Sequence, residues 1–388
     1  MVYMKRKVCI VTGTRAEWGL LSSIAQQLKL RQDVELQIIA TNMHLDARYG
    51  HTIDDIFAMG FEVNAQVPMM VDDDSCVSTA KAMAKCAEGM ADAFALLAPD
   101  LIVILGDRYE MLSVASVATV MRIPIIHLHG GEISEGAIDD SIRHAITKLS
   151  SLHLTATEEY RNRVIQMGEH PETVINTGAI GVYNIANITP MSLAELNTSL
   201  DFEITPGTLL VTYHPATLDD EDVATRCKAL LEALDEFTNK VIITYPNNDA
   251  QGRVIIDLIE EYASNNQGRV MVKPSLGLLR YISALHYVDV VVGNSSSGII
   301  EVPSMGIPTV NIGMRQQGRM ASESVIHCAD DKDSIVEAIR YALSDAGREK
   351  AKYAQNPYCK ENTLQLIVEA IATTPLEDLR RKTFYDLK

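Results

Sequence analysis

The stretch Val-Asp-Val-Val-Val-Gly-Asn-Ser-Ser-Ser-Gly-Ile-Ile-Glu, at residues 288–301, decides the fold. Its apolar start, 288–292, predicts a buried strand, and residues 299–305 predict the first turns of a helix. Backbone N–H groups and the positive end of a helix dipole face an anion at such a turn, so residues 293–298 predict a phosphate site. Glu301 follows one turn later, where its carboxylate can accept from two vicinal hydroxyls, such as those of a ribose. The stretch indicates a nucleotide diphosphate; the alternative is a serine-capped helix start that binds nothing.

The rest of the chain repeats this alternation of strand and helix. Short apolar runs alternate with longer amphipathic segments, which indicates an α/β fold with parallel sheets. The predicted strands are residues 8–12, 36–40, 101–105, 123–128, 152–156 and 174–177, then 209–213, 241–245, 270–272, 288–292, 309–312 and 325–328. Six strands in each half predict two Rossmann-like doubly wound domains facing across a cleft. Turn-forming residues near 181–190 place the junction between the two domains there. The predicted domains are residues 1–184 and 185–365. Residues 366–388 are predicted to form a tail that packs back on the first domain.

The amino-acid composition argues against several classes of binding partner and site. The chain has 388 residues, with 51 acidic and 34 Lys or Arg residues and a net charge of −17, which argues against a nucleic-acid partner. Binding an anionic nucleotide therefore needs local cations, and the candidates beside motifs are Arg15, Arg108, Arg315 and Arg319. The sequence contains no apolar stretch of about 20 residues, so we expect no membrane span. Six scattered cysteines without a CxxC pair fit a reducing cytoplasm and no zinc site.

Charged and hydrogen-bonding residues follow five of the predicted strands. We expect them to converge on one crevice with residues 293–298, which we call the serine turn. They are Gly-Thr-Arg-Ala-Glu at 13–17, Gly-Asp-Arg-Tyr-Glu at 106–110, His-Gly-Gly-Glu at 129–132, His-Pro at 214–215 and Pro-Asn-Asn-Asp at 246–249. The first is neither a Walker A loop nor a GxGxxG turn, which argues against ATP hydrolysis and NAD binding. Arg15 is instead a candidate clamp for a phosphate or carboxylate.

Three carboxylates are candidates for acid–base chemistry. Asp107 follows an apolar strand, where burial would raise its pKa and Arg108 would lower it; the alternative is a helix cap. Glu132 follows paired glycines that let the backbone approach a ligand closely. Asp139 opens a predicted helix, where an acidic residue can merely complement the dipole. His214, at a strand end, can donate to a diphosphate, although a lone histidine is often structural.

These motifs occur in the same order in one family. Four of them were introduced above, at residues 13–17, 106–110, 129–132 and 293–301. The others are Met43-His44 with Tyr49-Gly50, Ile-Arg-His-Ala-Ile-Thr-Lys at 142–148, and Arg315-Gln316 with Gly318-Arg319. From about residue 7 to about residue 365, the chain resembles the hydrolysing UDP-N-acetylglucosamine 2-epimerases of bacterial sialic acid synthesis.

This resemblance implies a fold of the glycosyltransferase B type, with a UDP-sugar between the domains and no cofactor or metal. The family reaction eliminates UDP by abstracting the C2 proton, which forms 2-acetamidoglucal. Water then adds with inversion at C2 and gives free N-acetylmannosamine. The resemblance also implies a homodimer.

The resemblance carries roles to individual residues. Asp107 and Asp139 would move protons near C2, and Glu132 would act at C1. UDP would be held by Arg15, Arg108, His214, Asn248, Ser295, Ser296, Ser297, Gly298, Glu301 and Arg315. Glu17, His44 and His129 would lie near the sugar.

One departure concerns the residue that precedes the glycine pair. Some relatives carry a catalytic glutamate at the position of His129, whereas here Glu132 comes three residues later, with one extra residue before Asp139. Either Glu132 serves instead, or His129 takes part, or two carboxylates suffice.

The stretch 132–140 equally resembles epimerases of UDP-N,N′-diacetylbacillosamine in legionaminic acid synthesis. Three rival functions are a non-hydrolysing 2-epimerase, a glycosyltransferase of the same fold and a non-catalytic sensor of nucleotide sugars. The acidic first half argues against the transferase, and the three carboxylates argue against the sensor.

Overall fold

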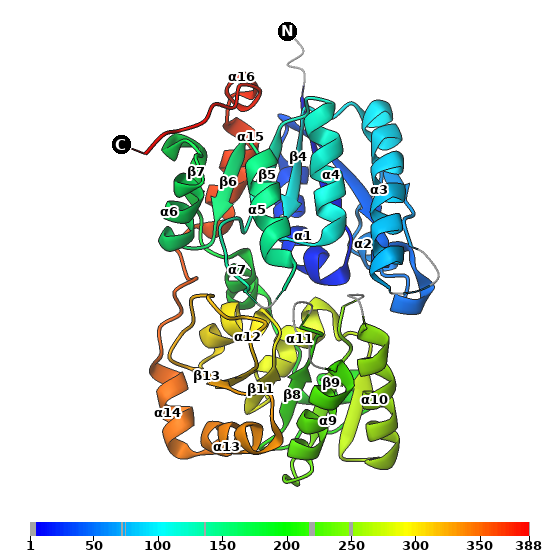
Figure 1. Ribbon diagram of the computed structural model, residues 1–388, viewed down its shortest axis with the longest axis vertical. Helices are drawn as coiled ribbons and strands as arrows, with labels where there is room; N and C mark the ends of the chain where they lie inside the picture. Colours follow the sequence, from blue (N-terminus) through cyan, green and yellow to red (C-terminus); the bar gives the residue numbers. More distant parts are fainter. Residues whose placement is uncertain are drawn as a thin grey trace. The chain divides into compact units, whose positions relative to one another are not determined.

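A computed structural model of the chain describes residues 5–70, 73, 75–135, 137–216, 222–247 and 251–387. The chain forms two compact units, whose elements are labelled in Figure 1. Unit 1 contains Met1–Glu132, Asp139–Asn184 and Lys360–Lys388, and unit 2 contains Ile133–Ile138 and Ile185–Cys359. Unit 1 is therefore discontinuous in sequence.

Each unit is built on one parallel sheet. Among the described residues, unit 1 has seven strands in the order β3-β2-β1-β4-β5-β6-β7, and unit 2 has six in the order β10-β9-β8-β11-β12-β13. The strands of unit 1 are β1 (Arg6–Thr12), β2 (Val34–Thr41), β3 (Ala65–Val67), β4 (Leu101–Leu105), β5 (Ile125–Leu128), β6 (Leu152–Thr155) and β7 (Val174–Asn176). Those of unit 2 are β8 (Leu209–Thr212), β9 (Val241–Thr244), β10 (Val270–Lys273), β11 (Val290–Gly293), β12 (Thr309–Ile312) and β13 (Val325–Cys328). Both orders are those of doubly wound Rossmann sheets.

The predicted strands are all present, and their ends differ from the prediction by at most two residues. The structure also contains one strand that the sequence pattern does not predict, β3, because its residues Ala-Gln-Val form no apolar run. Two Rossmann-like α/β domains, the predicted fold class, are confirmed by this sheet order.

Both faces of each sheet are buried, which explains the continuous apolar runs in the sequence. In β1, Val8 and Ile10 belong to one core cluster, whereas Cys9 and Val11 belong to another. The residues of β8 divide between two clusters in the same way.

Helices supply the other side of these cores. In unit 1 they are α1 (Arg15–Leu30), α2 (Ile53–Ala58), α3 (Cys76–Leu97), α4 (Tyr109–Val120), α5 (Asp139–Leu149), α6 (Glu158–Gln166), α15 (Thr363–Thr373) and α16 (Leu376–Leu379). In unit 2 they are α8 (Leu193–Leu200), α9 (Val223–Leu234), α10 (Gly252–Asn265), α11 (Gly277–Leu285), α12 (Ser297–Ile300), α13 (Lys332–Leu343) and α14 (Asp345–Tyr353). The boundary between Asn184 and Ile185 falls inside α7 (Ile180–Asn187). Short 3₁₀ turns, including η1 (Asn42–Leu45) and η4 (Val302–Met305), complete the chain.

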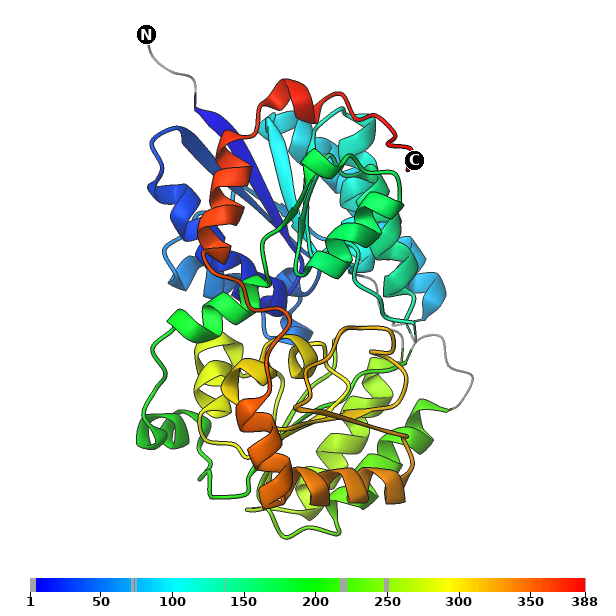
Figure 2. The same ribbon diagram turned by 90° about the vertical axis from the view of Figure 1, so that its left-hand side faces the viewer.

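The C-terminal segment belongs to unit 1. Leu364, Ile367 and Ile371 of α15 share a core cluster with Ile24 and Leu28 of α1. Figure 2 shows α15 and α16, in red, alongside the strands of unit 1.

Strand order fixes where each unit can bind a ligand. In doubly wound sheets, ligands bind at the carboxyl ends of the strands where the strand order reverses. This point lies between β1 and β4 in unit 1 and between β8 and β11 in unit 2. The residues that follow these strands are therefore the first candidates for a functional site.

Candidate active site

The turn after β1 in unit 1 is held by a buried carboxylate. Thr14 caps α1, and Glu17 accepts from the backbone N–H groups of Gly13 (2.7 Å) and Thr14 (3.1 Å), which forms a capping box. Burial, followed by the nearby charge of Glu110, raises the pKa of Glu17 to about 8. The hydrogen bonds of Glu17, predicted to lie near the sugar, are thus those of a helix cap.

Arg15 and His44 flank the same turn. Nε of Arg15 lies 2.6 Å from Oδ2 of Asp55 in α2, so the predicted phosphate clamp has an acidic neighbour. His44, in η1, is fully buried, and its two ring nitrogens contact the hydroxyls of Thr12 (3.0 Å) and Thr52 (2.8 Å). Burial lowers the pKa of His44 to about 4, so the ring is neutral near pH 7.

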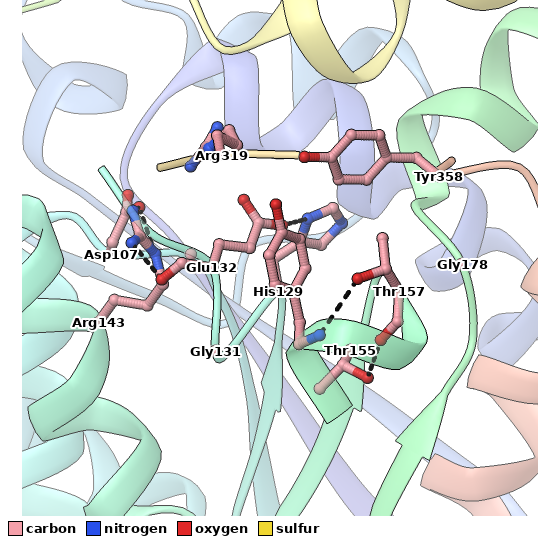
Figure 3. Close-up of polar contacts among 12 residues, drawn as sticks. Asp107, His129, Gly131, Glu132, Arg143, Thr155, Thr157, Gly178, Arg319 and Tyr358 are labelled. Carbon is pink, nitrogen blue, oxygen red and sulfur yellow. Dashed lines mark hydrogen bonds and ion pairs between the residues drawn. The ribbon is translucent and has the colours of Figure 1, made fainter. Parts of the chain in front are cut away.

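Asp107 follows β4 and forms an ion pair with Arg143 of α5 (Figure 3). Nε of Arg143 donates to Oδ2 of Asp107 (2.9 Å), and Nη2 approaches the same oxygen. His127 steadies the turn, because its Nε2 donates to the carbonyl oxygen of Gly106 (2.7 Å). The next residue, Arg108, caps α4, and its Nε donates to Oε1 of the buried Glu110 (2.9 Å).

Arg143 gathers the predicted acid–base residues. Its side chain is almost completely buried, and its Nη1 donates to the carbonyl oxygen of Glu132 (2.8 Å) and to Asp140 (3.2 Å). Asp140 adjoins Asp139 in the first turn of α5. One guanidinium therefore holds together the end of β4, the loop after β5 and the start of α5.

His129 and Glu132 form a second pair after β5. Nδ1 of His129 lies 2.7 Å from Oε1 of Glu132, and both residues are buried. Figure 3 shows the two side chains together. His129 adopts the left-handed backbone conformation, with a φ of 65°. Its backbone N–H donates to the carbonyl oxygen of Leu154 in β6 (3.0 Å). Glu132 therefore has a histidine partner that the sequence spacing alone does not reveal.

In unit 2, Asn294 joins the ends of β8 and β11. Its Oδ1 accepts from the backbone N–H of His214 (2.7 Å), and its Nδ2 donates to the His214 carbonyl (2.8 Å). Gly293 is required before it, because a side chain at this φ of 135° would collide with the backbone of Thr212. Nδ1 of His214 accepts from the backbone N–H of Asn247 (3.2 Å). The His214 ring proton is consequently on Nε2, where it can donate to an anion.

The serine turn that follows is shorter than the sequence predicts. Ser296 occupies the N-cap position of α12, which is a single turn, and the 3₁₀ turn η4, with Pro303 as its second residue, follows in place of a continuing helix. A single turn has a small dipole, so backbone N–H groups and hydroxyls, more than a macrodipole, are available to an anion. Ser297 contacts the hydroxyl of Tyr281 in α11 (2.5 Å).

The remaining predicted UDP residues lie around this turn. Ser295 precedes the cap, and Gly298 packs against Thr309, while Glu301 is buried at the end of α12. Nη1 of Arg315 donates to the carbonyl oxygen of Asn294 (3.1 Å). Asn248 lies outside the described residues. His214, the serine turn and Arg315 thus share one framework, which Asn294 organises.

Sequence reasoning placed Arg143 and Asn294 in motifs but gave neither residue a role. A signal for Arg143 was present, because a cation on the buried side of an amphipathic helix needs a carboxylate partner. Asn294 gave a weaker signal, since an amide that only joins two loops resembles any turn residue.

The described residues show neither a metal cluster nor a membrane span. Within this part of the chain, no three His, Cys, Asp or Glu side chains group as metal ligands would. No helix of the same residues is long and apolar enough to cross a membrane.

Comparison with known proteins gives a family and a fold. A family model described as UDP-N-acetylglucosamine 2-epimerase matches residues 26–372. A Campylobacter jejuni protein named GDP/UDP-N,N′-diacetylbacillosamine 2-epimerase (hydrolyzing) is 40% identical over 83% of this chain and 84% of its own length. Polysialic acid biosynthesis protein P7 of Escherichia coli is 35% identical over 98% of both chains.

A solved structure shares the fold. The UDP-GlcNAc 2-epimerase from Neisseria meningitidis, bound to UDP-GlcNAc, aligns with a TM-score of 0.79 over 95% of this chain and 100% of that one. The two sequences are 17% identical in this alignment.

Proposed function

We propose that this chain, which belongs to the UDP-N-acetylglucosamine 2-epimerase family, is a hydrolysing 2-epimerase that converts a UDP-2-acetamido sugar to UDP and the free C2-inverted sugar. The main support for this proposal is the group of contacts around Arg143, which we call the Arg143 cluster. One buried guanidinium contacts Asp107, the backbone of Glu132 and the first turn of α5, which begins with Asp139. Such a cluster suits a reaction that removes and returns a proton at C2 and adds water at the neighbouring C1.

The first half-reaction is the elimination of UDP. A carboxylate removes the proton from C2, the C–H electrons form the C1=C2 double bond, and the C1–O bond breaks with its electrons going to UDP. Asp107 and Asp139 are the proposed proton movers at C2. Arg143 holds the Asp107 carboxylate in place through their ion pair, and a carboxylate is a suitable base for this proton transfer.

UDP must be stabilised as it leaves. Unit 2 supplies groups for this role, because His214 carries its ring proton on Nε2 and the serine turn offers hydroxyls and backbone N–H groups. Arg315 lies beside the same turn and adds positive charge. Glu301 is the proposed acceptor for the ribose hydroxyls. Arg15, Arg108 and Asn248 stay proposals as further UDP contacts.

The second half-reaction hydrates 2-acetamidoglucal. A proton returns to C2 from the opposite face, and water adds at C1, so the product is the C2 epimer. The hydrolysing outcome is favoured over the non-hydrolysing one because the Campylobacter relative carries that activity in its name.

Two substrates are candidates. UDP-N-acetylglucosamine is the substrate implied by the motifs and supported by the polysialic acid relative. UDP-N,N′-diacetylbacillosamine is favoured by the 40% identity to the Campylobacter protein. The two sugars differ at C4 and C6, so the pocket around these atoms must discriminate between them.

A proton NMR time course in D₂O with each UDP-sugar tests the proposal. We expect UDP and a free sugar of inverted C2 configuration that carries deuterium at C2. The sugar that is turned over identifies the substrate. If the chain releases no UDP and no free sugar from either compound, the proposed function is refuted. A product that keeps its UDP would indicate the non-hydrolysing class.

The predicted homodimer and cytoplasmic location belong to the same proposal. Light scattering on the purified chain measures the first, and cell fractionation the second.

A further inference from the structure

His129 occupies a backbone conformation that its side chain disfavours. A φ of 65° costs a non-glycine residue about 1 kcal/mol or more. The surrounding structure maintains it, because the His129 N–H donates to Leu154 and two glycines follow at once. Strain of this kind gathers at functional sites.

The ring of His129 is aligned by Glu132. A carboxylate only accepts hydrogen bonds, so the 2.7 Å contact with Oε1 of Glu132 puts the ring proton on Nδ1. Nε2 then carries a lone pair. Among the described residues it has no hydrogen-bond partner, although it is buried.

The remaining buried histidines of unit 1 differ from this arrangement. His127 and His44 use both ring nitrogens in contacts with neighbouring groups. His153 also contacts a glutamate, Glu169, but that carboxylate is shared with two lysines and His153 lies within β6. Of these four, His129 alone combines a carboxylate partner with a place at the carboxyl end of a strand.

We propose that His129 is a catalytic base for the hydration half-reaction and that Glu132 is its positioning residue. This proposal rests on the proposed function and deepens it. Glu132 is poorly suited to meet the sugar itself, because its Oε1 is engaged by His129 and its carbonyl oxygen accepts from Arg143.

The step balances in atoms and electrons. A protonated carboxyl group gives its proton to C2, and the C1=C2 electrons form the new C–H bond. A lone pair of water forms the C1–O bond while Nε2 of His129 accepts a proton from that water. The imidazolium, stabilised by the Glu132 carboxylate, then gives its proton through solvent to the carboxylate that the first transfer left, which restores both groups. The net change is addition of one water across C1=C2.

His129→Gly is the decisive variant, because glycine relieves the left-handed strain and leaves room for added imidazole. With the sugar that the wild-type chain turns over, we expect the variant to release UDP while the corresponding 2-acetamido glycal accumulates. Formation of the free epimer should fall by about 100-fold or more, and imidazole should restore part of it. UDP release that is lost in parallel with hydration would overturn the assignment.

His129→Asn is the matched control, because asparagine tolerates the left-handed conformation but cannot accept the proton. It should accumulate the same unsaturated sugar, and imidazole should not rescue it because the site is filled. Wild-type product formation by this variant would sink the proposal. UDP affinity and circular dichroism check that both variants are folded.

The role of Glu132 is tested in both backgrounds. Glu132→Gln should lower kcat with KM nearly unchanged in the wild-type chain, and should add little in His129→Gly because the two residues act as a unit. Equal losses in the two backgrounds would contradict a positioning role. If the wild-type chain releases UDP from neither sugar, the proposed function fails first.

Discussion

At the scale of single residues, Asp107 is the proposed base for the elimination. Asp107→Asn keeps the size of the side chain but removes the charge, so kcat should fall by about 100-fold or more. UDP affinity should stay near that of the wild type, because the proposed UDP framework of unit 2 does not include Asp107. Steady-state kinetics with UDP titration calorimetry measures both. Full activity in this variant would disprove the assignment.

Glu301 should act in binding instead of chemistry. Glu301→Ala removes the proposed acceptor for the ribose hydroxyls, so the Kd for UDP should rise while kcat at saturating substrate is comparatively spared. Calorimetry with UDP and with UMP checks this. An unchanged UDP affinity combined with a lost kcat would contradict the role.

Glu17 should make stability depend on pH. Its pKa is raised from 4.5 to about 8, so the folded state keeps a proton that the unfolded chain loses within this window. The free energy of unfolding should therefore fall as pH rises from about 4.5 to about 8, by at most about 1.4 kcal/mol per pH unit. Glu17→Gln cannot titrate, so urea denaturation across this range should give a shallower slope. An identical slope would show that different groups dominate.

Residue-level prediction from sequence is possible where polar residues follow a strand end, although the roles of these residues stay predictions. Asp107, Glu132 and His214 are recognisable because each comes shortly after an apolar run. The contact between His129 and Glu132 was not predictable, since it depends on a backbone conformation that no residue pattern specifies.

At the scale of elements, α5 is fixed at its far end by the C-terminal segment. Lys382 donates to the carbonyl oxygens of Lys148 and Ser150 (both 2.6 Å) and contacts Glu169 (2.8 Å). A cation at this end of a helix satisfies its last carbonyls and complements its dipole. Because α5 begins with Asp139 and contains Arg143, the contact supports the proposed site from the opposite end of the helix.

Lys382→Met tests this support. It keeps the aliphatic stem but removes the charged donor, so the free energy of unfolding should drop by about 1–2 kcal/mol, the lower part of the range for charged hydrogen bonds because the side chain is partly exposed. Arg381→Met, at the exposed neighbouring position, should change it by less than about 0.5 kcal/mol. Equal effects of the two substitutions in thermal denaturation would argue against the cap.

Element-level prediction failed where local signals are short. β3 has three residues and no apolar run, so only its pairing with β2 defines it as a strand. The turns after Ser297 read as one helix because Ile299 and Ile300 are apolar, but Pro303 ends the α-helical pattern. Pairing partners and proline geometry override the hydrophobic period in these cases.

At the scale of the whole molecule, unit 1 needs its last helices. Ile367 and Ile371 of α15 are almost completely buried against α1. Ile371→Ala should therefore cost about 2–5 kcal/mol. Urea denaturation followed by circular dichroism measures this loss, with the exposed Thr373→Ala as control. A cost below about 1 kcal/mol would mean that α15 is not a structural part of the core.

The fold class was predictable because both sheets leave the same trace. Strands buried on both faces give uninterrupted apolar runs, and the helices between them require parallel pairing. The membership of residues 133–138 in unit 2 was not predictable, since it rests on contacts such as that between Glu135 and Gln317, far apart in sequence.

The discontinuity of unit 1 has a consequence for biosynthesis. A ribosome delivers β1 and α1 long before α15, so part of one face of the first sheet stays uncovered until α15 is made. Most of unit 2 lies in the single stretch 185–359, so its sheet can be completed while this face of unit 1 is still uncovered. Nascent chains should thus expose an apolar surface around Ile24 and Leu28 that chaperones can bind until α15 emerges.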